Sequence, residues 1–129
     1  YQINNINSTF SCGCMIDREK LLRVIIMQYK LSHSSLDTER FQGVLIKYDL
    51  NDTVCQSQPG VCSCTVRCAG KGRGSGQGQC KRGTISVFQS GKINITGCTQ
   101  LHQLHTMYEF INSVLVTHFQ TVYLRVGFM

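Results

Sequence analysis

The sequence predicts an α+β domain in which an antiparallel sheet carries helices on one side. Three observations predict this class. Short segments alternate apolar and polar residues, two longer segments repeat apolar residues at helical spacing, and the strands are joined mainly by hairpins. With 129 residues, the chain has the length of one domain and can bury a core of its own.

The first half of the chain predicts two strands separated by one helix. Residues 3–12 alternate between apolar and polar side chains, which is typical of a half-buried strand. Asp17 is a good N-cap for a helix in "REKLLRVIIMQYK", because its carboxylate can accept a hydrogen bond from a free amide of the first turn. A polar bridge over 31–39 then leads to a second strand in "RFQGVLIKYDL".

The second half predicts a long insertion, a hairpin and a helix. Periodicity vanishes over 51–83, where cysteine and glycine accumulate, and the alternating glycines of "GKGRGSGQGQ" predict a mobile segment without a core. The segment "GTISVFQSGKINITG" predicts a β-hairpin that turns at Gly91. A final helix follows a cap at Thr99, and 121–129 form a C-terminal extension. The expected core face of that helix comprises Leu101, Leu104, Tyr108, Ile111, Leu115 and Phe119.

The net charge of +6 is concentrated in one part of the chain. Between Thr53 and Gly83 the charged residues are all basic, which favours a polyanionic partner, with a solvated loop as the alternative. No apolar run is long enough to span a membrane, so we expect no membrane partner. The chain has no Ser-His-Asp order, paired carboxylates or phosphate-loop pattern, and we therefore expect that it is not an enzyme. The basic residues are Arg67, Lys71, Arg73, Lys81 and Arg82.

Four segments together resemble one repeat of the TATA-box-binding protein family. "INNINSTFSCGCMID" is similar to the family's first strand, and "ERFQGVLIKY" is similar to its Arg-Phe-Pro-Gly-Val-Ile segment. "ISVFQSGKINITG" resembles its Phe-x-Ser-Gly-Lys hairpin ending in Thr-Gly, and "MYEFINSVL" resembles the final helix of its C-terminal repeat. The resemblance implies that 1–129 form a single repeat, with a curved antiparallel sheet and two helices packed on its convex face. The Cys-rich, basic insertion then occupies the stirrup loop beside the DNA.

The resemblance also implies a DNA-binding role for the concave face of the sheet. In the family this face contacts the minor groove, and phenylalanines wedge between base steps and bend the duplex. Phe41 and Phe88 match these wedges, and Lys47 and Lys92 match phosphate-binding positions. The implied DNA-binding set is Asn5, Asn7, Thr9, Phe41, Leu45, Lys47, Ser86, Phe88, Lys92, Asn94 and Thr96.

Two features depart from the family pattern. Asn7, Ser86 and Asn94 stand where family members carry valine or leucine, which predicts a weaker apolar contact with A·T-rich DNA. A saddle also needs two repeats. The chain begins with Tyr1, and we expect either that it is half of a longer protein with a second repeat or that two copies form a homodimer.

The cysteines leave more than one interpretation open. Eight cysteines and three Asn-x-Thr sequons suit a secreted disulfide framework. Five cysteines, however, crowd into 55–80, and four thiolates can hold a tetrahedral zinc ion. A structural zinc is favoured, with disulfides and free thiols as alternatives, and Cys12, Cys14 and Cys98 are expected to be small buried hydrophobes. The candidate ligands are four of Cys55, Cys62, Cys64, Cys68 and Cys80.

The predicted function is a DNA-binding transcription-initiation or architectural factor that bends double-stranded DNA. The alternative is a protein-interaction module that has lost TATA binding and whose zinc-stapled stirrup docks a general transcription factor or a virion partner. A secreted disulfide protein is a third class. Ala69 is the single alanine, which fits an A+T-rich genome such as that of a large DNA virus or a protist. The expected location is intracellular, in the nucleus or in a viral factory or virion.

Overall fold

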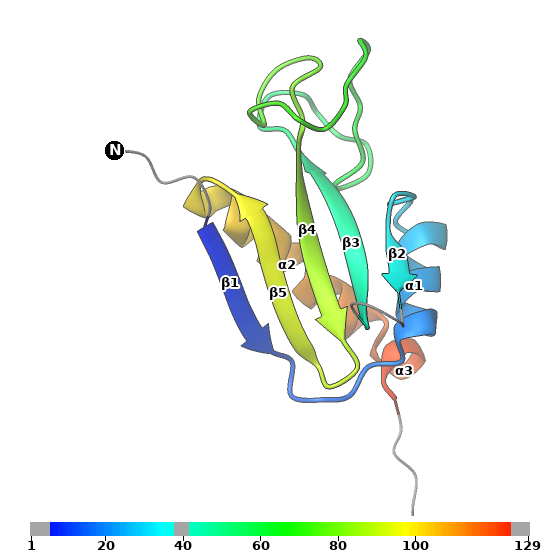
Figure 1. Ribbon diagram of the computed structural model, residues 1–129. Coiled ribbons are helices and arrows are strands. Elements are labelled where there is room, and N and C mark those ends of the chain that lie inside the picture. Colours follow the sequence, from blue (N-terminus) through cyan, green and yellow to red (C-terminus); the bar gives the residue numbers. More distant parts are fainter. Residues whose placement is uncertain (1–5, 38–41, 125–129) are drawn as a thin grey trace, which may run out of the picture.

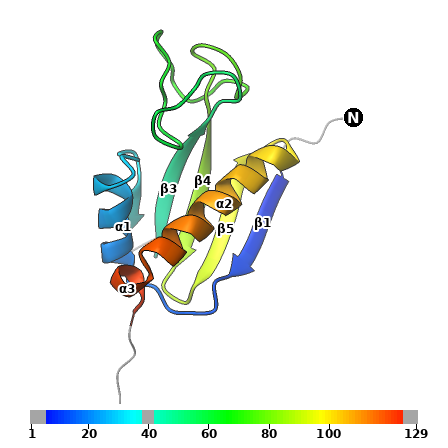
Figure 2. The ribbon, with the colours of Figure 1, turned by 180° about the vertical axis from the view of Figure 1, so that it is seen from behind.

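A computed structural model describes residues 6–37 and 42–124. Five antiparallel strands form one sheet in the order β1-β5-β4-β3-β2, and helices pack on one of its faces (Figure 1). Seen from behind, α2 runs diagonally across the sheet and α1 lies beside β3 (Figure 2). This arrangement confirms the predicted α+β class. The elements are β1 (Ile6–Ser11), α1 (Arg18–Met27), β2 (Ser35–Asp37), β3 (Gly43–Leu50), β4 (Lys81–Phe88), β5 (Lys92–Cys98), α2 (Leu101–Thr117) and α3 (Phe119–Val122).

The strand register separates a buried face from a polar face. Ile46 pairs with Ile85 and Ile85 pairs with Ile95, and all three are fully buried beneath the helices. Burial of each such side chain contributes roughly 2 kcal/mol of apolar transfer free energy. The alternate residues lie on the other face, which no helix of the described ranges covers (Figure 1). We call it the uncovered face; it carries Asn7, Thr9, Ser11, Leu45, Lys47, Asp49, Arg82, Thr84, Ser86, Phe88, Lys92, Asn94 and Thr96.

The first helix begins where the sequence predicts. Asp17 is its N-cap, and the Asp17 Oδ1 atom accepts a hydrogen bond of 3.2 Å from the amide of Lys20. Leu21 and Ile25 are completely buried, one turn apart on the face that packs against the sheet. The capping residue therefore predicted the start of α1, and the helical spacing predicted its core face.

The expected core face of the last helix is wrong in part. Leu101, Tyr108 and Phe119 are 70%, 40% and 40% exposed, and Phe119 lies in α3 rather than in α2. The helix begins after Gln100 rather than after Thr99, and Gln103 turns inward, where its Oε1 accepts a hydrogen bond of 2.9 Å from the amide of Thr99. A neighbouring stripe of the helix therefore faces the sheet. The buried residues of α2 are Gln103, Met107, Phe110, Ile111, Val114 and Leu115.

Two short elements fall outside the predicted ones. The expected polar bridge contains β2, in which Leu36 pairs with Val44 of β3. The expected C-terminal extension begins inside α3, where Val122 is fully buried, and Tyr123 forms an isolated bridge with Ile16. Three-residue strands and one-turn helices carry too little periodicity to be recognised without their partners.

The insertion follows an irregular path between Leu50 and Lys81 and projects from one end of the sheet (Figure 1). Its chain returns along β3, where the amide of Asp49 donates a hydrogen bond of 2.8 Å to the carbonyl of Gly60. Gly60 has a φ of +79°, and a Cβ atom there would lie 2.5 Å from the ring of Tyr48, so only glycine fits. The glycine-rich run also makes ladder-like hydrogen bonds, for example from the amide of Gly72 to the carbonyl of Cys80 at 2.9 Å.

Candidate metal centre and candidate nucleic-acid interface

Four cysteines of the insertion converge next to the start of β4. Their sulfur atoms all lie within 4.8 Å of one another, and the sulfurs of Cys64 and Cys80 are 3.7 Å apart. A tetrahedral thiolate centre with metal–sulfur bonds near 2.3 Å places its sulfurs about 3.8 Å apart. The cluster of Cys62, Cys64, Cys68 and Cys80 therefore has the ligands and the size to hold one metal ion; we call it the tetracysteine cluster.

Each sulfur of the tetracysteine cluster accepts an N–H hydrogen bond. The amide of Gly78 donates to Cys64 Sγ at 3.2 Å, and the amide of Cys80 donates to Cys68 Sγ at 3.3 Å. Cys62 Sγ accepts from the Cys64 amide at 3.5 Å, and Cys80 Sγ accepts from the side-chain amide of Asn51 at the same distance. Such donors stabilise thiolates and orient metal ligands.

Burial and hydrogen bonding act in opposite directions on these thiols. Burial raises the pKa of Cys68, but hydrogen bonds from the amides of Gly70 and Cys80 outweigh it and lower the pKa to about 7. Burial raises the pKa of Cys80, which is fully enclosed. Binding of a metal ion requires the thiolate forms, so metal binding at this cluster releases protons.

The structure distinguishes the fifth candidate ligand from the other four. Cys55 is exposed and does not belong to the tetracysteine cluster. The spacing of the cysteines allowed any four of the five to be metal ligands, and the path of the insertion brings only the other four together. Cys55 is therefore the cysteine that a four-ligand centre does not use.

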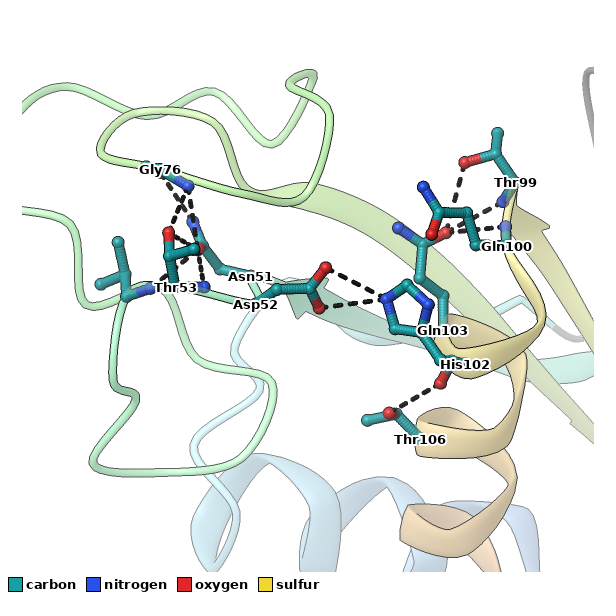
Figure 3. A network of polar contacts seen from close by, with 10 residues as sticks. Asn51, Asp52, Thr53, Gly76, Thr99, Gln100, His102, Gln103 and Thr106 are labelled. Atoms are coloured by element: carbon teal, nitrogen blue, oxygen red, sulfur yellow. Dashed lines mark hydrogen bonds and ion pairs between the residues drawn. The ribbon is translucent and has the colours of Figure 1, made fainter.

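The insertion is tied to the rest of the domain at its first residues. Asn51 Oδ1 accepts hydrogen bonds from the amides of Val54 at 2.9 Å and Gly76 at 3.2 Å (Figure 3). The next residue, Asp52, forms an ion pair of 3.0 Å with His102 of α2 (Figure 3). The Asn-Asp pair directly after a strand was a local turn signal. Nothing in the sequence predicted the contact with His102, which is distant along the chain.

A buried ion pair joins β3 and β4 below the insertion. Arg82 Nε donates to Asp49 Oδ1 at 2.8 Å, and Arg82 Nη2 donates to Asp49 Oδ2 at 3.3 Å, so the contact is bidentate. The side chain of Asp49 is 8% exposed. Beside it lies a pocket of about 210 Å³ that also contacts Lys30 and Lys47, together with two cysteines of the tetracysteine cluster. This end of the sheet therefore combines basic side chains with the candidate metal centre.

The uncovered face brings most of the predicted DNA-binding residues together. Thr9, Asn94, Ser86 and Leu45 form one row across four strands. Polar side chains of this row lie between two lysines. Lys47 Nζ donates a hydrogen bond of 3.0 Å to Thr84 Oγ1, and Lys92 Nζ lies 6.0 Å from the centre of the Phe88 ring. Thr84 was not among the predicted residues, although its place in the alternation could have indicated it.

The predicted residues differ in how much surface they offer. Ser86 is 5% exposed, and Asn94 Oδ1 is buried without a hydrogen-bond partner in the described part of the chain. Asn5 and Phe41 lie outside the described residues. The exposed members are Asn7, Thr9, Lys92 and Thr96, and the half-buried ones are Leu45, Lys47, Phe88 and Asn94.

The remaining cysteines differ from one another. Cys98 is fully buried, its thiol lies 3.6 Å from the sulfur of Met107, and burial raises its pKa, as expected for a small buried hydrophobe. Cys12 and Cys14 are only half-buried.

Comparisons with known protein families, with curated proteins and with solved structures find no match for this chain. The resemblance to the TATA-box-binding protein family therefore stays a prediction. Among the described residues, no helix is both long and apolar enough to cross a membrane.

Proposed function

We propose that this domain is a binding protein that contacts double-stranded DNA through its uncovered face. One observation carries the proposal: the polar side chains of Thr9, Asn94 and Ser86 form one row across three strands, on a face that no described helix covers. Lys92 and Lys47 lie in the neighbouring rows on either side of it. Amide and hydroxyl groups can hydrogen-bond the acceptors of a minor groove, and the flanking ammonium groups can reach phosphates.

The proposed mode of binding is contact with a widened minor groove. Phe88 is half-buried at the end of β4 and lies next to Lys92, so an apolar ring and a charge occupy the same edge of the face. A ring in this position can wedge between base steps while the lysine neutralises a phosphate. This mode, and a role in transcription initiation or DNA architecture, rest on the family resemblance. A second repeat or a second copy of the chain would complete the saddle.

Duplex binding measured by fluorescence anisotropy at several salt concentrations tests the proposal. Lys47→Gln and Lys92→Gln are each expected to weaken binding and to reduce the slope of log affinity against log salt by about 0.9, one phosphate contact each. Lys20→Gln is the matched control, because Lys20 is exposed on α1, on the helical side of the sheet. Equal affinities and slopes for all three variants would contradict the proposal.

Bending of the duplex provides a separate readout. Energy transfer between dyes at the two ends of a duplex is expected to rise on binding of the wild-type protein, and to rise less with Phe88→Ala. Binding without any change in energy transfer would support a nucleic-acid interface but would contradict the insertion of the Phe88 ring between base steps.

We also propose that the tetracysteine cluster holds a structural zinc ion. Four thiolate ligands in a closed, hydrogen-bonded arrangement favour zinc over harder cations. A thiolate centre of this kind suits the reducing interior of a cell, in agreement with an intracellular location. Native mass spectrometry is expected to show one zinc ion per chain, lost in Cys68→Ser but retained in the control Cys55→Ser. The same spectrum reports whether the chain is a dimer.

The insertion supports a second candidate function, a docking site for a protein partner. It projects beyond the sheet, it is positively charged, and the hydrogen-bonded contact between Asp52 and His102 connects its base with α2 (Figure 1, Figure 3). If this function is the main one, Arg67→Glu and Arg73→Glu abolish capture of the partner while Lys47→Gln and Lys92→Gln leave it intact. The opposite pattern in duplex binding would favour the uncovered face.

A further inference from the structure

A second pair of cysteines lies at the end of β1, outside the tetracysteine cluster. The sulfur atoms of Cys12 and Cys14 are 3.3 Å apart, closer than ordinary sulfur–sulfur contact, and Cys12 Sγ also donates to the carbonyl of Cys14 at 3.2 Å. Both residues are half-buried. Neither was expected to have a chemical role, and the tetracysteine cluster does not include them.

The backbone holds these two thiols on the same side. Gly13, between them, has a φ of +80°, which folds the chain so that the flanking side chains converge. Its amide donates to Ser11 Oγ at 3.1 Å, and the amide of Cys12 donates to the carbonyl of Gly91 at 3.0 Å. Gly91 lets the segment approach closely, because a Cβ atom there would lie within 2.2 Å of the Cys14 carbonyl oxygen.

The pair opens onto a cavity. A pocket of about 490 Å³ lies between the end of β1 and α2, and its lining includes both cysteines together with Phe10, Tyr108 and Phe119. Tyr108 and Phe119 are each 40% exposed, so the pocket is open to solvent. A small thiol or disulfide molecule can therefore reach the sulfur atoms from the pocket, whereas the enclosed thiol of Cys98 has no such access.

We propose that Cys12 and Cys14 form a thiol modification site, at which a small-molecule disulfide such as oxidised glutathione converts the pair into an intramolecular disulfide. Cys12 loses its proton to solvent, and its thiolate attacks one sulfur of the small disulfide, forms a mixed disulfide and releases one small thiolate. Cys14 then loses its proton to solvent, attacks the Cys12 sulfur and releases the second small thiolate. Two protein thiols are oxidised by two electrons, and one small disulfide is reduced to two thiols.

The two sulfurs have different tasks in this sequence. Burial, together with the hydrogen bond and charge of Cys12, raises the pKa of Cys14 to about 11, so Cys14 keeps its proton and acts second. The contributions of Cys12 vanish once its sulfur is part of a mixed disulfide, and Cys14 then becomes the resolving thiol. Closing the pair brings the two sulfurs from 3.3 Å to about 2.05 Å.

The chain 1–129 in the presence of zinc provides a direct test, because cleavage after Arg18 releases peptide 1–18, whose only cysteines are Cys12 and Cys14. After treatment with oxidised glutathione and alkylation, this peptide is expected to be lighter by two hydrogens than its dithiol form, to carry no alkyl group and no glutathione, and to return to the dithiol with a reductant. The exposed thiol of Cys55 is the internal control and is expected to carry a glutathione adduct. A peptide that stays in the dithiol form while Cys55 is modified would overturn the proposal.

Two variants separate the roles of the sulfurs. Cys14→Ser is expected to accumulate a stable glutathione adduct on Cys12, because the resolving thiol is missing. Cys12→Ser is expected to be modified more slowly, because burial still raises the pKa of Cys14 when Cys12 is replaced. Equal rates of adduct formation in the two variants would refute the assignment of attacking and resolving thiols. Whether the disulfide forms at all is decided separately, by the mass of peptide 1–18 from the wild-type chain.

Discussion

Loss of the Arg82 guanidinium is expected to leave the Asp49 carboxylate buried without its partner. Removing one partner of a buried ion pair costs about 3–5 kcal/mol. The side chain of Arg82 is 29% exposed, so water can solvate part of the site, and we expect Arg82→Met to lower the free energy of unfolding by about 2–3 kcal/mol. For a chain of this length that loss corresponds to a fall in Tm of roughly 9 °C.

Denaturant unfolding with zinc in excess measures this loss, because zinc bound at the proposed site would keep the insertion in the same state in every variant. Arg73→Met is the matched control; Arg73 is exposed, and we expect a change within about 0.5 kcal/mol. The double variant Asp49→Asn plus Arg82→Met removes the orphaned charge and is expected to recover more than half of the loss. If the double variant is as unstable as Arg82→Met alone, burial of an unpaired charge is not the cause.

Three further predictions concern the insertion, the β4–β5 turn and the core. Chelation of the metal is expected to raise amide hydrogen exchange across 51–80 and to leave β5 protected; unchanged protection of the insertion would contradict this. Gly91→Ala is expected to cost more than about 2 kcal/mol, because a left-handed φ is combined with a clash against the Cys14 carbonyl. Gly13 also has a positive φ, but a Cβ atom there would meet no neighbour, so Gly13→Ala should lower the free energy of unfolding by only about 1 kcal/mol. If thermal unfolding shows equal losses of stability for the two variants, the clash at Gly91 is not the cause. Burial raises the pKa of Cys98 above its ordinary value of 9.0, so the thiol loses its proton at a lower pH in the unfolded chain than in the folded one. The free energy of unfolding is therefore expected to fall as the pH rises above 9.0, by at most about 1.4 kcal/mol per pH unit. Denaturant titrations of Cys98→Ala should show a smaller fall over the same pH range.

Local signals predicted the framework of the fold. Period-two alternation identified β1, β3, β4 and β5, and the carboxylate of Asp17 marked the start of α1. These signals work because strand alternation and helix capping depend on near neighbours in the chain. β2 was missed because its three residues become a strand only through their pairing with β3.

Contacts between distant segments could not be predicted in the same way. The spacing of five cysteines did not exclude Cys55, because the path of the insertion decides which sulfurs meet. The face of α2 was misjudged because the helix carries apolar residues on two adjacent stripes, and the buried one, with Met107, Phe110 and Val114, also contains the polar Gln103. The pairing of Asp52 with His102 follows from the position of the insertion above α2. The close approach of Cys12 and Cys14 did have a local signal, since the glycine between them permits the left-handed bend.

The hydrogen bond from Asp49 to Gly60 has a consequence for how the molecules behave toward one another. β2 pairs only with the first part of β3, and the returning chain of the insertion covers the edge of β3 beyond it. An uncovered edge offers free amides and carbonyls to a strand of another molecule and invites aggregation. If metal binding holds the insertion in place, then loss of the metal exposes this edge. The same ion that orders a loop would in that case also keep the protein in solution.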